Sequence, residues 1–495
     1  MEFLISVLRF IGILLLVIMM FNIMIVVHEW GHFLAGRWRG LYIDRFQIWF
    51  GKPIWKKKYN GVQYGLGSIP AGGFVSLPQM APMESIEGKV DDEDGDGEKK
   101  KELPPVKPID KMIVAVAGPL FSFLLAVVFA VIVWAVKKPV SESVGTTVVG
   151  TVYEDSPAEK AGILPGDKIT FVDGKKVERF QGMDKSIMWT IISSENQNIE
   201  IDLERPGKGE MTVTVERPAE AKKVEVDGPW YKQVWTYLSE RPPLRTIGVG
   251  PQISPVVGRM LENSPAEQAG LRSGDIIRKV NDTAVSTPQE VSSFGWAADE
   301  PVTLTIERGD KMIETEITPR VPEVDGTKPL IGVEWDGEGI RTLVREDPIT
   351  QVINSFNAIV RTLKAVFSPK SDVSAGHLSG PVGIMGLYYD LFQHSEGWRL
   401  ALWFSVLLNV NLAILNMLPF PVLDGGHIVM ASVEAFRKRP IPFKLLEVVQ
   451  TAFVLLLLGF MAFVTLKDVG DRVPKGETVE APTAPKFLPL KDDSE

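Results

Sequence analysis

Residues 4–27 form an apolar run that leads without a break into His28-Glu29-Trp30-Gly31-His32. The run reaches the ~20 residues that an α-helix needs to cross the hydrocarbon core of a bilayer. Because it has no basic start followed by a small-residue cleavage site, it differs from a secretory signal peptide, and we expect it to remain as a membrane helix. The polar motif therefore lies at one end of a membrane span.

Three further apolar stretches are long enough to cross a bilayer, at residues 112–136, 400–418 and 445–466. Polar segments lie between them, and 23% of the 495 residues are charged. The formal net charge of −9 and the lack of a sustained basic stripe argue against nucleic acid as a partner. The sequence therefore predicts a multi-pass α-helical membrane protein with four transmembrane helices in a lipid bilayer, carrying soluble modules.

Positively charged residues set the expected orientation, because Lys and Arg in short loops favour the cytoplasmic side. Several follow the first span, including the Lys run at 56–58, and Arg437-Lys438-Arg439 separates the third span from the fourth. Both loops are expected in the cytoplasm, which leaves residues 139–395 and the C-terminal tail outside. Lys137 and Lys138, at the outer end of the second span, oppose this trend but are outnumbered.

The outer segment contains an internal repeat: Ser156-Pro157-Ala158 recurs as Ser264-Pro265-Ala266, and Gly166-Asp167 as Gly274-Asp275. Each copy has the pattern of a short helix stopped by Gly, followed by a strand after Gly-Asp. This arrangement resembles the circularly permuted PDZ domains of bacterial envelope proteases. We therefore expect two β-rich PDZ domains, at residues 139–232 and 233–325. PDZ domains bind extended peptides at a sheet edge; whether this pair binds peptide or only excludes bulky molecules stays open.

The remaining segments are connections and ends. Residues 326–395 are expected to hold a linker and an amphipathic helix at 348–367, which would lie on the outer membrane surface or pack against the PDZ pair. The charge run at 91–101 is typical of a solvated loop, and the Pro-rich, acidic tail at 471–495 is typical of disorder. Residues 1–138 and 396–470 would each hold two membrane helices.

His28, Glu29 and His32 form the pattern His-Glu-x-x-His, which is typical of zinc hydrolases. Positions four apart share one face of a helix, so both imidazoles can bind one Zn²⁺ while Glu29 accepts a proton from water beside them. The chain has no Cys and only five His, so any metal must be held by His and carboxylate. Polar groups at membrane depth are costly unless they pair, bind metal or line a wet cavity.

A catalytic zinc needs a third protein ligand and an open position. Asp424, just past the third span, falls at the same inner depth as His32. We expect the two glycines that follow it to allow a turn that aims its carboxylate inward. His427 lies close by and is not excluded by chemistry alone, whereas His377 and His394 are expected on the outer surface.

The whole arrangement resembles the bacterial site-2 protease family. The resemblance rests on His-Glu-x-x-His in the first span, Leu-Asp-Gly around Asp424 at the third, and paired PDZ domains between the second and third spans. It implies an intramembrane zinc metalloprotease in which His28, His32 and Asp424 bind Zn²⁺. In such an enzyme Glu29 is the catalytic base. It also implies that Asn416, eight residues before the aspartate, contacts the substrate backbone.

Two further stretches match signatures of that family. Residues 64–75 resemble its membrane-associated β-hairpin, and we expect Gly72 and Gly73 to lie against substrate there. An exposed strand edge can replace the hydrogen bonds that a substrate helix loses when it is unwound. Residues 117–122 match the signature Gly-x-x-x-Asn/Ser/Gly, with Ser122 where many members carry Asn. A hydroxyl reaches less far than an amide, so the role of Ser122 stays open.

The resemblance implies site-2 cleavage of single-pass membrane proteins during regulated intramembrane proteolysis in a bacterial inner membrane. The PDZ domains would be periplasmic and the active site near the cytoplasmic side. Implied substrates are an anti-sigma factor of a stress response, already shortened on its outer side, and remnant signal peptides. Two other classes fit less well. A catalytically silent PDZ scaffold needs no intact metal motif, and a zinc transporter needs a second row of His or acidic residues through the membrane.

Overall fold

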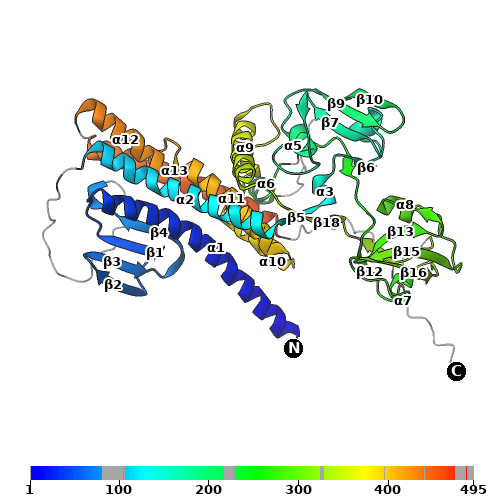
Figure 1. Ribbon diagram of the computed structural model, residues 1–495. Coiled ribbons are helices and arrows are strands. Elements are labelled where there is room, and N and C mark those ends of the chain that lie inside the picture. Colours follow the sequence, from blue (N-terminus) through cyan, green and yellow to red (C-terminus); the bar gives the residue numbers. More distant parts are fainter. Residues whose placement is uncertain are drawn as a thin grey trace.

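The computed structural model describes residues 2–80, 104, 106–216, 229–242, 244–323, 328–394, 396–439, 441–473 and 486–487. The predicted charge run at 91–101 and most of the predicted tail lie outside these residues. A small sheet, a bundle of long helices and two β-rich units follow one another across the molecule (Figure 1).

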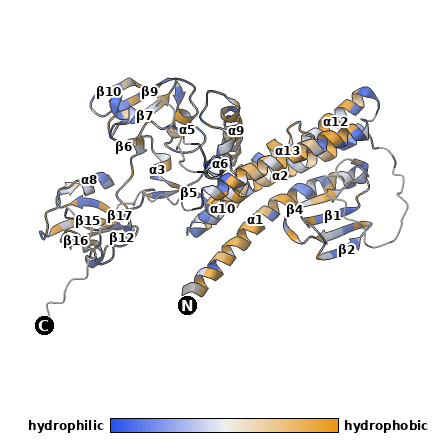
Figure 2. Cartoon of the chain, turned by 180° about the vertical axis from the view of Figure 1, so that it is seen from behind, coloured by the Kyte–Doolittle hydropathy of each residue, from blue (hydrophilic) through white to orange (hydrophobic). Residues whose placement is uncertain are grey.

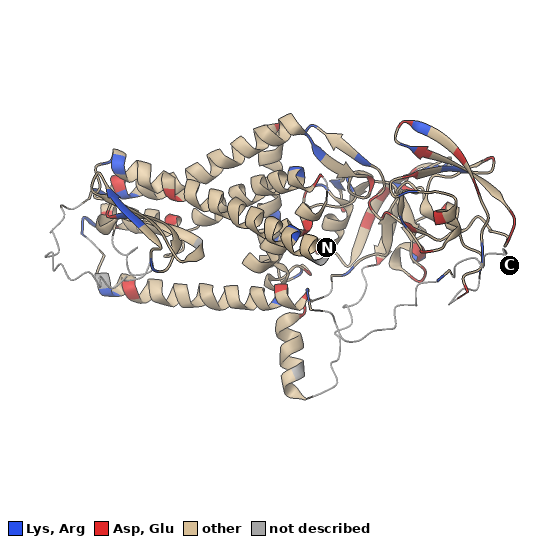
Figure 3. Ribbon diagram, turned by 90° about the horizontal axis from the view of Figure 1, so that it is seen from below, with Lys and Arg blue, Asp and Glu red and all other residues tan. Residues whose placement is uncertain are grey.

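Four helices have the length and apolar character of membrane spans within the described residues. They are α1 (Glu2–Trp38), α2 (Pro108–Val136), α11 (Gly397–Asn416) and α13 (Phe443–Gly470). Their residues are apolar over most of their length (Figure 2), and charged residues gather mainly near their ends (Figure 3). The prediction of four candidate spans is therefore confirmed. Helix α1 continues past the predicted end of its apolar run, so the whole His-Glu-x-x-His motif is helical.

Helix α2 is the centre of the bundle, because it packs against both α1 and α11. Helix α9 (Pro348–Phe367) coincides with the predicted amphipathic range and packs on α2 and α11. Its residues Val352, Ile359 and Leu363 join the core of the membrane bundle, while Ile353 and Phe356 are exposed. Helix α9 thus packs mainly on the helix bundle, and not mainly on the PDZ pair as one of the two predicted alternatives had it.

A four-stranded sheet lies beside the inner half of α1. Its strands are β1 (Arg45–Phe50), β2 (Trp55–Tyr59), β3 (Val62–Leu66) and β4 (Ile69–Ser76), in the order β2-β3-β1-β4. The predicted hairpin over residues 64–75 is wrong in its pairing, because β1 lies between β3 and β4. The true hairpin joins β2 to β3 through Asn60 and Gly61, whose positive φ values of 46° and 83° suit a tight two-residue turn. Strand β4 is left as an edge strand.

The outer region contains two units built to the same plan. The first has β6 (Val149–Val152) paired with β11 (Val249–Pro251), and a sheet of β7 (Lys168–Val172), β8 (Lys175–Lys176), β9 (Asn198–Arg205) and β10 (Gly209–Glu216). The second has β12 (Val257–Met260) paired with β17 (Val333–Trp335), and a sheet of β13 (Ile276–Val280), β14 (Thr283–Ala284), β15 (Val302–Arg308) and β16 (Lys311–Ile317).

The predicted domain boundaries need correction. Strand β11 pairs with β6 and Ile247 joins the first core, so the first unit extends beyond 232. Strand β17 pairs with β12, and Ile331 joins the second core, so the second unit extends beyond 325. Each unit closes with a strand that follows a long connection, and a boundary drawn from the repeated motifs alone misses such a strand.

The repeated residues build the same local structure in both units. Ser156 caps the short helix α4 (Pro157–Lys160), and Ser264 caps α7 (Pro265–Gln268). The buried Asp167 pairs with Arg205 at 2.7 Å, and the buried Asp275 pairs with Arg308 at 2.6 Å. The pKa of Asp167 is lowered by its hydrogen bonds to Arg205 and the Leu164 amide, despite the opposing effect of burial.

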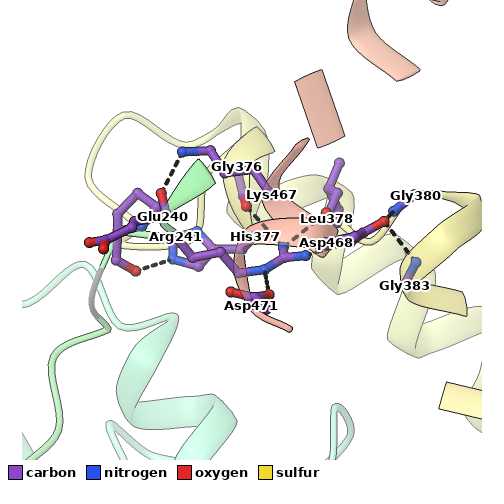
Figure 4. A network of polar contacts seen from close by, with 11 residues as sticks. Glu240, Arg241, Gly376, His377, Leu378, Gly380, Gly383, Lys467, Asp468 and Asp471 are labelled. Carbon is purple, nitrogen blue, oxygen red and sulfur yellow. Dashed lines mark hydrogen bonds and ion pairs between the residues drawn. The ribbon is translucent and has the colours of Figure 1, made fainter. Parts of the chain in front are cut away.

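The outer end of α13 is held by a network of polar contacts (Figure 4). The carboxylate of Asp468, with a fully buried side chain, accepts hydrogen bonds from Arg241 Nη2 at 2.7 Å and from the amides of Gly380 and Gly383 at 2.9 and 2.8 Å. Gly380 precedes α10 (Pro381–Gln393) and Gly383 lies in it, while Arg241 follows α6 (Trp230–Ser239), a helix that the sequence analysis did not predict. Lys467 adds hydrogen bonds to the carbonyl oxygens of Tyr237 and Glu240.

We predict that Asp468→Ala destabilises the protein by about 3 kcal/mol, because it leaves a guanidinium and two buried amides without their acceptor. Asp471→Ala is the matched control. Asp471 pairs with the same Arg241, but its side chain is 45% exposed, so its loss should cost less than about 1 kcal/mol. Thermal unfolding of the detergent-solubilised protein measures both, and equal losses would contradict the prediction.

Candidate metal centre

Three potential metal ligands meet in the bundle, with one ligand atom from each lying within 4.8 Å of the others. His28 and His32 come from α1, and Asp424 is the first residue of α12 (Asp424–Arg437). Both imidazole Nε2 atoms lie 3.3 Å from an Asp424 carboxylate oxygen and 3.3 Å from each other. All three residues are buried. The structure therefore brings together residues separated by almost four hundred positions.

The two imidazoles are held by their other ring nitrogens. His32 Nδ1 lies 2.8 Å from the carbonyl oxygen of Val114, which can only accept a hydrogen bond. His28 Nδ1 lies 2.9 Å from the hydroxyl of Ser122, a fully buried residue of α2. Such partners orient metal-binding imidazoles and select the tautomer that leaves Nε2 free to bind. Ser122 thus has a structural role next to the centre, and the shorter hydroxyl is within reach of His28.

Glycines allow α1 and α2 to approach closely enough for these contacts. A Cβ on Gly118 would lie 2.1 Å from His32 Nε2, and a Cβ on Gly31 would lie 2.4 Å from the carbonyl oxygen of Ala117. Neither position can hold a larger residue without separating the helices. Gly118 and the Val114 carbonyl were missed by the sequence analysis, although the match at residues 117–122 pointed to this part of α2.

Asp424 follows a turn closed by a hydrogen bond from the Leu423 amide to the Phe420 carbonyl oxygen at 2.9 Å, and the backbone packs closely around it. Cβ atoms on Gly425 and Gly426 would lie 2.3 Å and 2.0 Å from the carbonyl oxygens of Leu418 and Phe420. Neither glycine is among the residues with positive φ. The glycines thus accompany the expected turn by leaving room for the chain that leads from α11 into α12, and not by positive φ values.

His427 lies on the next turn of α12 and is not part of the ligand cluster. It is buried beside Lys111 and Glu434, and burial lowers the pKa of its imidazole. The geometry therefore favours Asp424 over His427 as the third ligand. On the outer side, His377 caps its own turn and contacts the carbonyl oxygen of Pro242 at 2.8 Å. His394 follows the end of α10.

Glu29 and Asn416 border the three ligands. Glu29 lies within electrostatic range of all of them, and the backbone N–H of Val75 in β4 is its hydrogen-bond partner. The side-chain nitrogen of Asn416 lies 3.5 Å from His28 Nε2. By contrast, Asn409 is fully buried and donates to the Ser405 carbonyl oxygen of its own helix. Asn416 is thus near the ligand atoms, and Asn409 is used within the bundle.

Gly72 and Gly73 lie in the edge strand β4, which runs beside α1. A Cβ on Gly72 would overlap the ring of Phe50 at 1.9 Å, and the residue has a φ of +72°. A Cβ on Gly73 would lie 3.3 Å from Ile25, one turn before His28. Both glycines let the strand pack tightly near the centre, which is a structural reason for them beside any contact with substrate.

The donor set fits zinc. Two imidazoles and one carboxylate are a common catalytic ligand set that leaves a fourth position open. The two imidazole Nε2 atoms lie 3.3 Å apart, as two corners of a tetrahedron with arms of about 2.0 Å would, and each lies 3.3 Å from a different oxygen of Asp424. With Nδ1 of His32 donating to Val114, its Nε2 carries a lone pair that faces Nε2 of His28.

We predict that Asp424→Asn lowers zinc affinity at least about tenfold, because the neutral amide removes the anionic ligand. His427→Ala is the matched control on the same helix and should keep zinc at the wild-type level. The measurement is the zinc content of purified protein after dialysis against a weak chelator. Loss of zinc in His427→Ala with retention in Asp424→Asn would reverse the assignment.

Comparison with known proteins agrees with this geometry. The model of peptidase family M50 matches residues 16–460. A putative zinc metalloprotease of Vibrio cholerae is 26% identical over 90% of this chain and 96% of its own. The regulator of sigma E protease of Haemophilus influenzae is 26% identical over 90% and 96%, and RseP of Escherichia coli K12 is 27% identical over 89% and 95%. The PDZ domain of an SdrC-like protein from Listeria innocua is 25% identical over 17% of this chain and 92% of its own, with a TM-score of 0.15.

These matches confirm the resemblance that the sequence motifs indicated. The family model spans most of the chain, from within α1 to within α13, and so includes all three ligand residues. Relatives that match nearly their whole length are named zinc metalloproteases. The chain belongs to peptidase family M50 and is a zinc metalloprotease.

Proposed function

We propose that this protease cuts the membrane-spanning segments of single-pass proteins, as the second cut of regulated intramembrane proteolysis. The observation that carries the proposal is the position of the His28–His32–Asp424 cluster. Two of its members lie in α1, one of the candidate membrane spans. Burying ionisable groups at membrane depth costs free energy, so their presence there indicates a function. A protease whose substrate is itself in the membrane needs its metal ligands at that depth.

The residues present support metal-assisted hydrolysis. His28, His32 and Asp424 would hold zinc, which when bound lowers the pKa of the attacking water and polarises the scissile carbonyl. Glu29 has no place among the three ligands and acts as the general base, taking the proton from water. It then returns this proton to the leaving amine. The Val75 amide fixes the Glu29 carboxylate, and Asn416 would bind the substrate backbone beside His28.

The edge strand β4 supports a way of holding the substrate extended. A transmembrane helix satisfies its peptide groups internally, so it must exchange those hydrogen bonds for others before it can be cut. A free strand edge offers such bonds. Because Val75 of this strand contacts Glu29, a substrate paired with β4 near Gly72 and Gly73 would pass the catalytic base.

Charge and arrangement support an inner-membrane orientation with the centre near the cytoplasm. The sheet β1–β4 and helix α12 lie at the same end of the bundle (Figure 1). The exposed strand β2 carries the Lys run at 56–58, and α12 ends at Arg437, next to Lys438 and Arg439. By the positive-inside rule this end is cytoplasmic, and the two β-rich units are periplasmic. An anti-sigma factor is the proposed substrate, with remnant signal peptides as a further class, because relatives are named regulators of sigma E protease.

We predict that Glu29→Gln lowers cleavage of a single-pass substrate by at least about a hundredfold, since a proton acceptor in the transition state is lost. Its zinc content should stay at the wild-type level. Glu434→Gln, which changes a carboxylate paired with Lys111, is the control and should cleave normally. The cleavage rate in detergent and the zinc content are measured on the same samples of each variant. Full activity of Glu29→Gln would refute the proposed mechanism.

We further propose that the two β-rich units are PDZ domains that together exclude bulky substrates. The connections into and out of this region are joined, because β5 (Lys138–Ser141) pairs with β18 (Arg341–Val344). Lys138 also forms an ion pair with Glu346 at 2.6 Å. The first unit also contacts helix α9, because Asp184 pairs with Arg361 at 2.7 Å. Blocking by size needs no tight binding of substrate to either unit.

We predict that deleting residues 146–336, which removes both units and keeps the β5–β18 pair, permits cleavage of a substrate that retains its outer domain. Cleavage of a shortened substrate, measured per folded molecule, should change less than about threefold, because the candidate ligands and β4 remain. The folded fraction is measured as well, since the deletion also removes Arg241, the partner of Asp468. Both substrates are assayed with full-length and deleted protease. If the deletion abolishes cleavage of the short substrate, the units recruit substrate rather than exclude it.

A further inference from the structure

Phe487, in the C-terminal tail, lies on the second outer unit. It is only 4% exposed, although a Phe in a polar terminal segment would ordinarily face solvent. The tail begins after α13 ends at Gly470 and is rich in Pro and charged residues. The burial of one aromatic side chain from this segment requires a specific site on the unit that covers it.

Three residues of the second unit form that site. The guanidinium of Arg320 lies 5.5 Å from the centre of the Phe487 ring, within the range of a cation–π contact. Asn263 Nδ2 is 3.5 Å from the carbonyl oxygen of Phe487 and can donate to it. The ring occupies the space above Gly332, where a Cβ would lie 2.9 Å from the Phe487 ring. The site therefore contacts both the side chain and the backbone of the bound residue.

Contacts within the second unit support the site. Arg320 Nη2 donates to the carbonyl oxygen of Asn263 at 2.6 Å, which holds the guanidinium next to the ring. Gly332 immediately precedes β17, and within the described residues β17 pairs only with β12, so one edge of β17 is open. A cavity of about 190 Å³ continues from Gly332 along this strand and is lined by Val291, Trp296 and Trp335, among others. A bound segment would therefore contact a site for its aromatic side chain, a strand edge for its backbone and a cavity for a further side chain. Sheet edges bind extended peptides through these features.

The described residues of the first unit share this framework but differ at the position of Asn263. Gly248 corresponds to Gly332: each glycine would place a Cβ 2.3 Å from a repeated serine, Ser156 or Ser264. The residue before that serine has positive φ in both units, but it is Asp155 in the first and Asn263 in the second. A carboxylate cannot donate to a peptide carbonyl, whereas an amide can. The three atoms nearest to a Cβ on Gly248 all belong to Ser156, whereas a ring carbon of Phe487 is among the three nearest at Gly332.

We propose that the second unit carries a binding site for an extended peptide with an aromatic side chain, and that the chain's own Phe487 occupies it as an intramolecular ligand. About seventeen residues separate Gly470 from Phe487, which at ~3.4 Å each allow a reach on the order of 58 Å. Any other peptide that uses this site must first displace the tail. The inference concerns binding alone, so it stands or falls independently of the proposed proteolysis.

Photo-crosslinking of the full-length protein in detergent tests the contact directly. A benzophenone amino acid replaces Phe487, and in the control it replaces Val473, which lies at the start of the tail and is 49% exposed. We expect position 487 to crosslink to the second unit near Asn263, Arg320 and Gly332 within one chain, and position 473 not to do so. Crosslinks elsewhere would overturn the proposal, and crosslinks between two chains would overturn its intramolecular part.

Peptide binding supplies an independent measurement. A fluorescent peptide of residues 481–495 should bind full-length Phe487→Ala at least tenfold more tightly than wild type, because the substitution empties the site. Adding Asn263→Gly to Phe487→Ala should weaken binding at least tenfold, since Gly keeps the positive φ but loses the amide. Asp155→Gly in the same background is the matched change in the first unit and should have no effect. Equal binding by wild type and Phe487→Ala, or no effect of Asn263→Gly, would refute the proposal.

Discussion

The close approach of α1 and α2 is the contact on which the metal centre depends. Gly31 rests on the carbonyl of Ala117, and Gly118 leaves the space that the His32 ring fills. Only at this separation can Ser122 and the Val114 carbonyl reach the two imidazoles. Helices in lipid gain little from apolar contact alone, so small residues and buried hydrogen bonds commonly define where they meet. The ligand geometry is thus a result of helix packing.

The same bundle explains why a strand lies beside the centre. Strand β4 packs on α1 through Gly73 and Ile25, and its Val75 amide meets Glu29. Inserting β1 between β3 and β4 makes β4 an edge strand supported by a four-stranded sheet rather than one arm of a hairpin. An isolated hairpin is at best marginally stable in water, and a wider sheet is a firmer support. An edge that must exchange hydrogen bonds with a substrate benefits from that support.

The two outer units show how a duplicated framework can diverge. Both keep a buried Asp–Arg pair, a Ser-capped short helix and a glycine packed on the capping serine. They differ at Asp155 and Asn263, where one side chain accepts and the other can also donate. The aromatic contact of Phe487 is made by the second unit, where Asn263 can donate to its carbonyl oxygen and Arg320 faces its ring.

The sequence by itself determined the four candidate spans, the helical pairing of His28 with His32 and the repeat in the outer region. These features depend on apolar run length and on spacing along one chain segment, which neighbouring residues decide. Tertiary structure alone placed Asp424 rather than His427 beside His28 and His32, and it found a partner for Ser122. It also placed β1 between β3 and β4 and closed each outer unit with a distant strand. Each of these depends on contacts between residues far apart in the chain. Such contacts follow from how whole helices and strands pack, and the spacing of residues within one segment does not predict that packing.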